Sequence, residues 1–236
     1  MLSFFSPSNI FVYLNKVIEF LNSIIFIVLL VALTFALVIS PPDYVQGDVV
    51  RIMYVHVPAA WISLAIFSIM TFSYIINYIF RIKNLLIINY SIAPLGLLFT
   101  ALAIITGSVW GKPTWGTWWA WDARLTSMIF LMFFYIALIL SLKYLNDERI
   151  KLKVTTTLSI IGFINVPIIR YSVDYLNTLH QPTSLKITGT STIHSSFLLP
   201  LFLMLLVFLI YSALIFLMKY KTEIIKMKKK RLKNYD

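Results

Sequence analysis

Five of the six tryptophans of this chain lie in one short stretch, VWGKPTWGTWWAWDARLTS, which covers residues 109–127. An indole ring is large, flat and apolar, and its N–H needs a polar partner, so tryptophan is common where lipid headgroups meet hydrocarbon. A belt of that kind is spread over many helix ends, whereas only Trp61 lies elsewhere in this chain. The concentration indicates either a slab in the membrane interface or a platform for a flat apolar ligand.

A short helix over this stretch would gather its indoles on one face. At 100° per residue, four tryptophans would fall within roughly 160° of arc. They are Trp115, Trp118, Trp119 and Trp121. Gly116 and Ala120 would lie on the opposite side and pack closely against a neighbour. The hypothesis is therefore an amphipathic helix with an indole face.

Three kinds of ligand suit an indole platform. A quaternary ammonium ion usually needs a carboxylate beside its aromatic cage, and Asp122 is the only one in the stretch. A sugar needs several amide and carboxylate neighbours, which the flanking segments largely lack. A porphyrin is flat and apolar, and its iron takes imidazole at one or both axial positions. His56 and His180, from separate segments on either side, could supply those bonds, or each could be an ordinary polar residue at the membrane surface.

Charged residues near these positions have two readings. A guanidinium can hold a carboxylate with two hydrogen bonds, which makes Arg124 the first candidate for a haem propionate, followed by Arg51 and Lys112. Each could instead face lipid phosphate. Asp122 directly precedes a predicted helix and is expected to be its N-cap. His194 is expected to be a polar residue at the interface.

The elements that position these side chains are membrane helices. The 236 residues are 60% hydrophobic and 12% charged, whereas a soluble domain carries roughly 25% charged residues. A bilayer core needs about 20 apolar residues in a helix. Six stretches qualify: 19–39, 58–80, 85–106, 125–142, 154–171 and 197–218. The sequence predicts an all-α integral membrane protein, one polytopic domain over 1–236, with a tryptophan-rich segment at 107–124. Because cysteine is absent, disulfides and thiolate ligands are excluded.

The distribution of positive charge predicts the orientation of the bundle. Fifteen of the 20 Lys and Arg residues lie near the termini or in the loops after the second and fourth predicted spans. The positive-inside rule makes that side cytoplasmic, so both termini lie inside. The basic C-terminal tail is expected to fix topology or touch anionic lipid rather than bind nucleic acid. All three histidines and the tryptophan-rich segment then share the outer face.

The stretch WGTWWAWD, residues 115–122, resembles the signature of the haem-handling WWD membrane proteins of cytochrome c maturation. Three groups share it: CcmC, the much longer CcmF, and CcsA. The flanking QGDVVRIMYVHVPAAW (46–61) and NTLHQPTS (177–184) are similar to the CcmC family, and the resemblance covers nearly the whole chain. At one point the chain departs from the pattern: Tyr175 and Leu176 stand where the family often has two tryptophans.

The resemblance implies that His56 and His180 are the axial ligands of a haem iron. It also implies a porphyrin-binding segment formed by Trp115, Trp118, Trp119, Trp121, Asp122 and Arg124. Haem b would be a cargo, held on the periplasmic face of a bacterial inner membrane and presented to the membrane-anchored chaperone CcmE; the mitochondrial inner membrane is the second location. The implied partners are the ABC transporter subunits CcmA and CcmB and the small membrane protein CcmD. The protein would be a carrier and not an enzyme.

Two other functions stay open. A haem-translocating transporter subunit would pass its solute through the chain, but ionisable residues, which mark such paths, are almost absent from the second to sixth spans. A stable membrane cytochrome would hold haem permanently between two histidines within helices, whereas His56 and His180 are expected in outer loops. Ligands on loops suit a cargo that must leave.

Overall fold

The computed structural model describes residues 7–181 and 193–233. Six long helices follow one another: α1 (Pro7–Thr34), α2 (Met53–Phe80), α3 (Lys83–Trp115), α4 (Ala123–Tyr144), α5 (Glu148–Tyr175) and α6 (Leu198–Lys233). Each belongs to a segment long and apolar enough to cross a membrane. The predicted all-α fold with six membrane helices is confirmed, and every predicted span overlaps its own helix.

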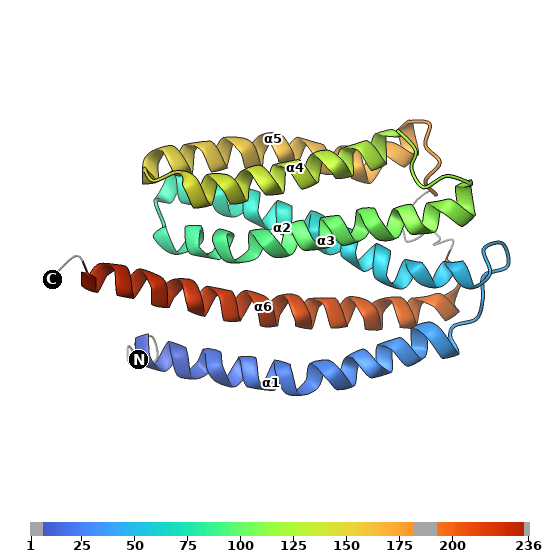
Figure 1. The fold of residues 1–236 in the computed structure, drawn as a ribbon, viewed down its shortest axis with the longest axis horizontal. Helices are drawn as coiled ribbons and strands as arrows, with labels where there is room; N and C mark the ends of the chain where they lie inside the picture. Colours follow the sequence, from blue (N-terminus) through green and yellow to red (C-terminus); the bar gives the residue numbers. More distant parts are fainter. Residues whose placement is uncertain (1–6, 182–192, 234–236) are drawn as a thin grey trace.

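The helices stack in the order α4 and α5, then α2 and α3, then α6, with α1 on the outside (Figure 1). The pair α4 and α5 packs on one side of α2 and α3, and the pair α1 and α6 packs on the other side through α6. Helix α1 begins and α6 ends at the same end of the bundle (Figure 1). We call the opposite end, where α3 leads into α4 and α5 ends, the distal end.

Two glycines let large rings pack between the layers. A Cβ on Gly96 of α3 would come within 2.2 Å of the Tyr135 ring of α4, so only glycine fits there. The Tyr135 hydroxyl donates to the carbonyl of Ser63 in α2 at 2.6 Å. Gly162 of α5 leaves similar room for Phe67 of α2. These contacts fix the relative positions of the helices that reach the distal end.

Helix α3 runs nine residues beyond its predicted end and stops at Trp115. Gly116 takes the left-handed conformation, with φ 76°, and its N–H donates to the carbonyl of Lys112 at 3.1 Å. Such a glycine ends a helix because it adopts positive φ without strain. Residues 117–122 are not helical. The hypothesis of one amphipathic helix carrying Trp115 to Trp121 is therefore wrong, and Gly116 is the physical reason.

The start of α2 also differs from the expectation. A 3-10 turn, Asp48–Ile52, leads directly into α2 at Met53, so His56 lies in the first turn of a helix and not in a loop. Pro58 is the sixth residue of α2, where it removes one backbone donor. Membrane helices tolerate such a proline because neighbouring groups satisfy the freed carbonyl. His180, by contrast, follows the end of α5 and lies in a loop, as predicted.

Candidate functional site

A cavity of about 560 Å³ lies at the distal end, within the range of about 300–1,000 Å³ usual for small-ligand sites. Helices α2 to α6 all contribute to its wall, together with residues 119, 180, 181 and 193. Most of the lining is apolar. The aromatic and basic side chains that line it are Trp61, Trp110, Trp115, Trp119, Phe202, His56, His180, Arg124 and Arg170.

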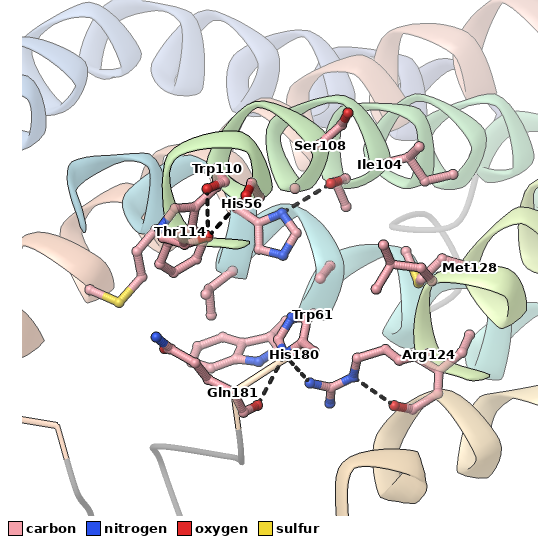
Figure 2. A pocket seen from close by; sticks show the side chains of 18 of the residues that line it. His56, Trp61, Ile104, Ser108, Trp110, Thr114, Arg124, Met128, His180 and Gln181 are labelled. Carbon is pink, nitrogen blue, oxygen red and sulfur yellow. Dashed lines mark hydrogen bonds between the residues drawn. The ribbon is translucent and has the colours of Figure 1, made fainter. Parts of the chain in front are cut away.

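The His56 ring is held by the backbone of α3. Its Nδ1 lies 2.9 Å from the carbonyl oxygen of Ala103 (Figure 2) and also 3.2 Å from the Thr106 hydroxyl. A carbonyl only accepts hydrogen bonds, so Nδ1 carries the ring proton. Nε2 therefore keeps its lone pair, and Figure 2 shows that nitrogen turned into the cavity. Histidines that bind metals usually donate their other N–H to such a partner.

Gly107 makes room for this ring. A Cβ at position 107 would lie 2.8 Å from Cε1 of His56 and 3.3 Å from its Nδ1. On the other side, the Trp110 ring meets His56 edge to face, with centroids 5.7 Å apart. The indole N–H of Trp110 donates in turn to the Gln46 side chain at 2.8 Å. His56 is thus fixed from three directions.

His180 is held by two side chains and a loop carbonyl instead of a helix backbone. The backbone N–H of His180 donates a hydrogen bond to the Thr178 hydroxyl at 3.0 Å. Its Nδ1 lies 2.8 Å from Nη1 of Arg124 and 3.0 Å from the carbonyl oxygen of Gln181 (Figure 2). Burial lowers the pKa of the His180 imidazole below its ordinary 6.5, and the Arg124 guanidinium lowers that pKa further. The ring is therefore neutral at neutral pH.

The two imidazoles face each other across the cavity, with ring centroids 6.3 Å apart and planes inclined by 34° (Figure 2). A metal–imidazole bond of about 2 Å, plus roughly 1 Å from the nitrogen to the ring centre, puts two axial imidazole centroids about 6 Å apart on one metal ion. The observed spacing of 6.3 Å is close to that value.

The tryptophans divide into two sets. Trp115 lies beside His180, with ring centroids 6.0 Å apart, and Trp119 lines the cavity with its buried indole N–H unpartnered among the described residues. Trp118 and Trp121 do not line the cavity; their side chains are 55% and 81% exposed. Of the four tryptophans predicted for the site, the structure therefore brings two to the histidines.

Of the three cationic residues predicted to contact a propionate, one lines the cavity and two do not. Arg124 lines the cavity, and its Nε donates to the carbonyl of Ile169 at 3.0 Å. The other two cations lie outside the cavity lining: Arg51 donates to the carbonyls of residues 37 and 40, and Lys112 donates to the carbonyl of Gly116. Arg170, which sequence reasoning did not single out, is the second guanidinium of the lining.

Asp122 lies outside the cavity lining and has two hydrogen-bond partners. One carboxylate oxygen accepts from the N–H of Leu125 at 2.8 Å, which confirms the predicted N-cap of α4. The other accepts from the Thr178 hydroxyl, the same hydroxyl that accepts from His180. Asp122 thus links the start of α4 to the loop that carries His180. His194 caps the short helix Ser195–Phe197 and also lies outside the lining.

Trp61 was missed because it lies far along the chain from the tryptophan cluster, and Gly107 was missed because it has no side-chain chemistry of its own. A helical repeat could have found Trp61, since residues 53, 56, 57, 60, 61 and 64 of α2 all line the cavity and share one helix face. The same spacing on α3 includes residues 103, 104, 107, 108, 111, 114 and 115. Helix packing determines which face of α2 meets which face of α3, and the spacing of residues along each helix does not reveal this.

The donor set limits which metal groups the cavity could hold. Within residues 7–181 and 193–233, no group of three or more His, Cys, Asp or Glu side chains could hold a metal ion. Two facing imidazoles alone leave a bare ion such as Zn²⁺, which takes four ligands, incompletely coordinated. A macrocycle that brings its own four nitrogens needs only these two axial ligands. The indole walls suit its flat faces and edges.

Comparisons with known proteins give a consistent result. The family model of CcmC, "Heme exporter protein C", matches residues 1–235. The chain is 36% identical to Heme exporter protein C of Bradyrhizobium diazoefficiens over 94% of this chain and 84% of that protein. It is 40% identical to Heme exporter protein C of Escherichia coli K12, over 81% and 77% of the two chains. A putative cytochrome c biosynthesis ccmC-like mitochondrial protein of Marchantia polymorpha is 40% identical over 79% of each chain.

Proposed function

The chain belongs to the CcmC family of haem exporter proteins, and we propose that it holds haem b as a cargo between His56 and His180. The observation that carries this proposal is the 6.3 Å spacing of the two facing imidazole centroids, which suits a single iron bonded to both. The four tryptophans of the cavity lining would surround the porphyrin. Trp118 and Trp121 remain candidates for contacts at its exposed edge.

The charges of the cavity suit the two propionates of haem. Arg124 and Arg170 both line the cavity, and guanidinium groups hold carboxylates well. These two cationic groups favour a ligand with negatively charged oxygens.

The proposed role is delivery of haem for cytochrome c maturation. The protein would hold haem on the periplasmic face of the inner membrane and present it to the haem chaperone CcmE, in association with the ABC transporter subunits CcmA and CcmB and the small protein CcmD. The positive-inside rule supports this orientation, because the basic segments lie at the end opposite the cavity. The chain itself would be a carrier, with no catalytic step assigned to it.

The experiment is purification in detergent with a haem assay and an absorption spectrum. We expect haem with a low-spin, two-imidazole spectrum, which His56→Ala and His180→Ala each abolish. His194→Ala is the matched control, because His194 caps a short helix outside the cavity lining, and it should retain the spectrum. If both histidine variants keep the wild-type spectrum, the ligand assignment is wrong.

A stable cytochrome with two histidine ligands is the second candidate, because His56 lies within a helix as such a ligand usually does. Incubation of the haem-loaded protein with the apo chaperone CcmE separates the two functions. A carrier loses its two-imidazole spectrum as haem moves to the chaperone, whereas a cytochrome retains it through repeated reduction and oxidation. The position of His180 in a loop favours the carrier function, because a ligand on a loop can release the iron.

A further inference from the structure

One nitrogen of His180 has two partners that make opposite demands on it. The guanidinium of Arg124, 2.8 Å from Nδ1, can only donate a hydrogen bond, whereas the carbonyl of Gln181, 3.0 Å from the same atom, can only accept one. Nδ1 of a neutral ring either carries a proton or presents a lone pair. It therefore satisfies one of these partners at a time.

The two pairings differ at the opposite nitrogen of the ring. When Nδ1 accepts from Arg124, the single ring proton sits on Nε2, the nitrogen that faces His56 in Figure 2, and Nε2 has no lone pair for iron. When Nδ1 donates to Gln181, Nε2 is free to bind iron. Moving the proton between the two nitrogens through solvent changes neither the charge of the ring nor any oxidation state.

His56 shows no such ambiguity. Its Nδ1 faces the carbonyl of Ala103 and the hydroxyl of Thr106, and that hydroxyl already donates to the carbonyl of Leu102 at 2.6 Å. Both neighbours of Nδ1 thus accept a hydrogen bond from it. His56 has one tautomer, with Nε2 ready for iron, whereas the tautomer of His180 depends on where Arg124 is engaged.

We propose that Arg124 is a positioning residue that withholds His180 from the iron until a carboxylate of the incoming porphyrin engages the guanidinium. This inference rests on the proposed haem cargo and adds a condition to it. The Nε of Arg124 is anchored on the carbonyl of Ile169 at 3.0 Å, so the guanidinium can exchange the partner of Nη1 without leaving the cavity. A charged carboxylate is a stronger acceptor than a neutral imidazole. Its arrival turns Nδ1 towards Gln181 and frees Nε2.

The test compares haem with haem dimethyl ester, in which both carboxylates are blocked. Wild-type protein in the same detergent should give a two-imidazole spectrum with haem and a one-imidazole spectrum with the ester, in the bound fraction of each. Arg124→Met keeps the apolar stem and removes every donor, so the ester should regain the second imidazole in this variant. Arg51→Met removes a cation outside the cavity lining and should behave as wild type with both porphyrins.

A two-imidazole spectrum of wild-type protein with the ester would overturn the inference, and this arm needs no variant that might fold poorly. A one-imidazole spectrum of folded Arg124→Met with the ester would overturn it as well. A different set of results would contradict the proposed haem cargo itself. In that case wild-type protein with haem itself lacks the two-imidazole spectrum, or His180→Ala leaves that spectrum unchanged.

Discussion

The two sides of the cavity hold their histidines in different ways. His56 stands in the first turn of α2, its ring set into the space above Gly107 and bonded to a backbone carbonyl of α3. His180 stands in a loop after α5 and is held through Thr178, Arg124 and Gln181. One proposed ligand belongs to the packed helices, whereas the other depends on loop and side-chain contacts that can exchange.

This difference suits a site that must both capture and release its cargo. A ligand fixed by helix packing is already in place when the cargo arrives, and little ordering free energy opposes its bond. A ligand on a loop can give up its bond without disturbing the core. The comparison therefore predicts unequal effects when the two sides are changed separately.

The largest effect is expected from loss of the fixed histidine. His56→Ala should reduce haem retention more than His180→Ala, because it leaves only the adjustable ligand, and the loss should exceed the roughly 10–100-fold typical of removing a partner of a metal ligand. The measurement is a haem-binding titration of both variants. Equal losses would mean that the two sides hold haem in the same way.

The second effect concerns the space that His56 occupies. In Gly107→Ala the new Cβ displaces the imidazole, so we expect about a 10–100-fold loss of haem affinity and a one-imidazole spectrum. Gly162→Ala is the matched control, since its Cβ would meet Phe67 and Phe134, which do not line the cavity. It should lower the thermal unfolding temperature while the spectrum of the folded protein stays unchanged. An unaltered spectrum in Gly107→Ala would show that the ring is less fixed than the contacts indicate.

A smaller effect should separate the tryptophans. Trp119→Ala removes a ring from the cavity wall, and an aromatic contact of about 0.5–1.5 kcal/mol corresponds to roughly a two- to tenfold loss of haem affinity. Trp121→Ala, at an 81% exposed side chain outside the lining, is the control and should leave the affinity unchanged. Equal losses in the two variants would contradict the division of the tryptophans into two sets.

The smallest effect concerns pH on the adjustable side. Iron needs neutral imidazole, and the pKa of His180 is lowered from 6.5 by burial and by Arg124, so protons compete with the iron only as the pH falls below that ordinary value. In a His56→Ala background, where His180 is the remaining ligand, acid release of haem should therefore begin below pH 6.5. Adding Arg124→Met removes one cause of the lowered pKa and should move release to higher pH. Bound haem and the Soret band, followed from neutral pH downward, provide the measurement.

The fold could be predicted because bilayer thickness sets the length of its elements. Six apolar stretches gave six helices, and Asp122 was recognised as an N-cap from its place before an apolar run. The end of α3 could not be placed from hydropathy, since residues 107–115 continue the helix beyond its apolar part. Gly116 was the available signal for that end, and it was assigned instead to the back of a helix that does not form.

The site could be predicted only in part. Trp119, Arg124 and the two histidines were recognisable by their chemistry, and all of them line the cavity. Gly107 has no chemistry of its own and matters only because α2 packs against α3 at that level. Arg170 was not singled out, because a single sequence does not reveal that this residue of α5 lines the cavity.

The segment between α3 and α4 is fixed at both ends, by Gly116 as the C-cap of one helix and by Asp122 as the N-cap of the next. Only residues 117–121 lie between these caps. The length of this loop therefore determines which of its side chains reaches the cavity: Trp119 does, and its two neighbours do not. A change in the length of this loop would therefore change which side chain lines the cavity. Deleting or inserting one residue here would offer the cavity a neighbouring side chain, such as Trp118 or Ala120, in place of Trp119, even though every tryptophan was kept.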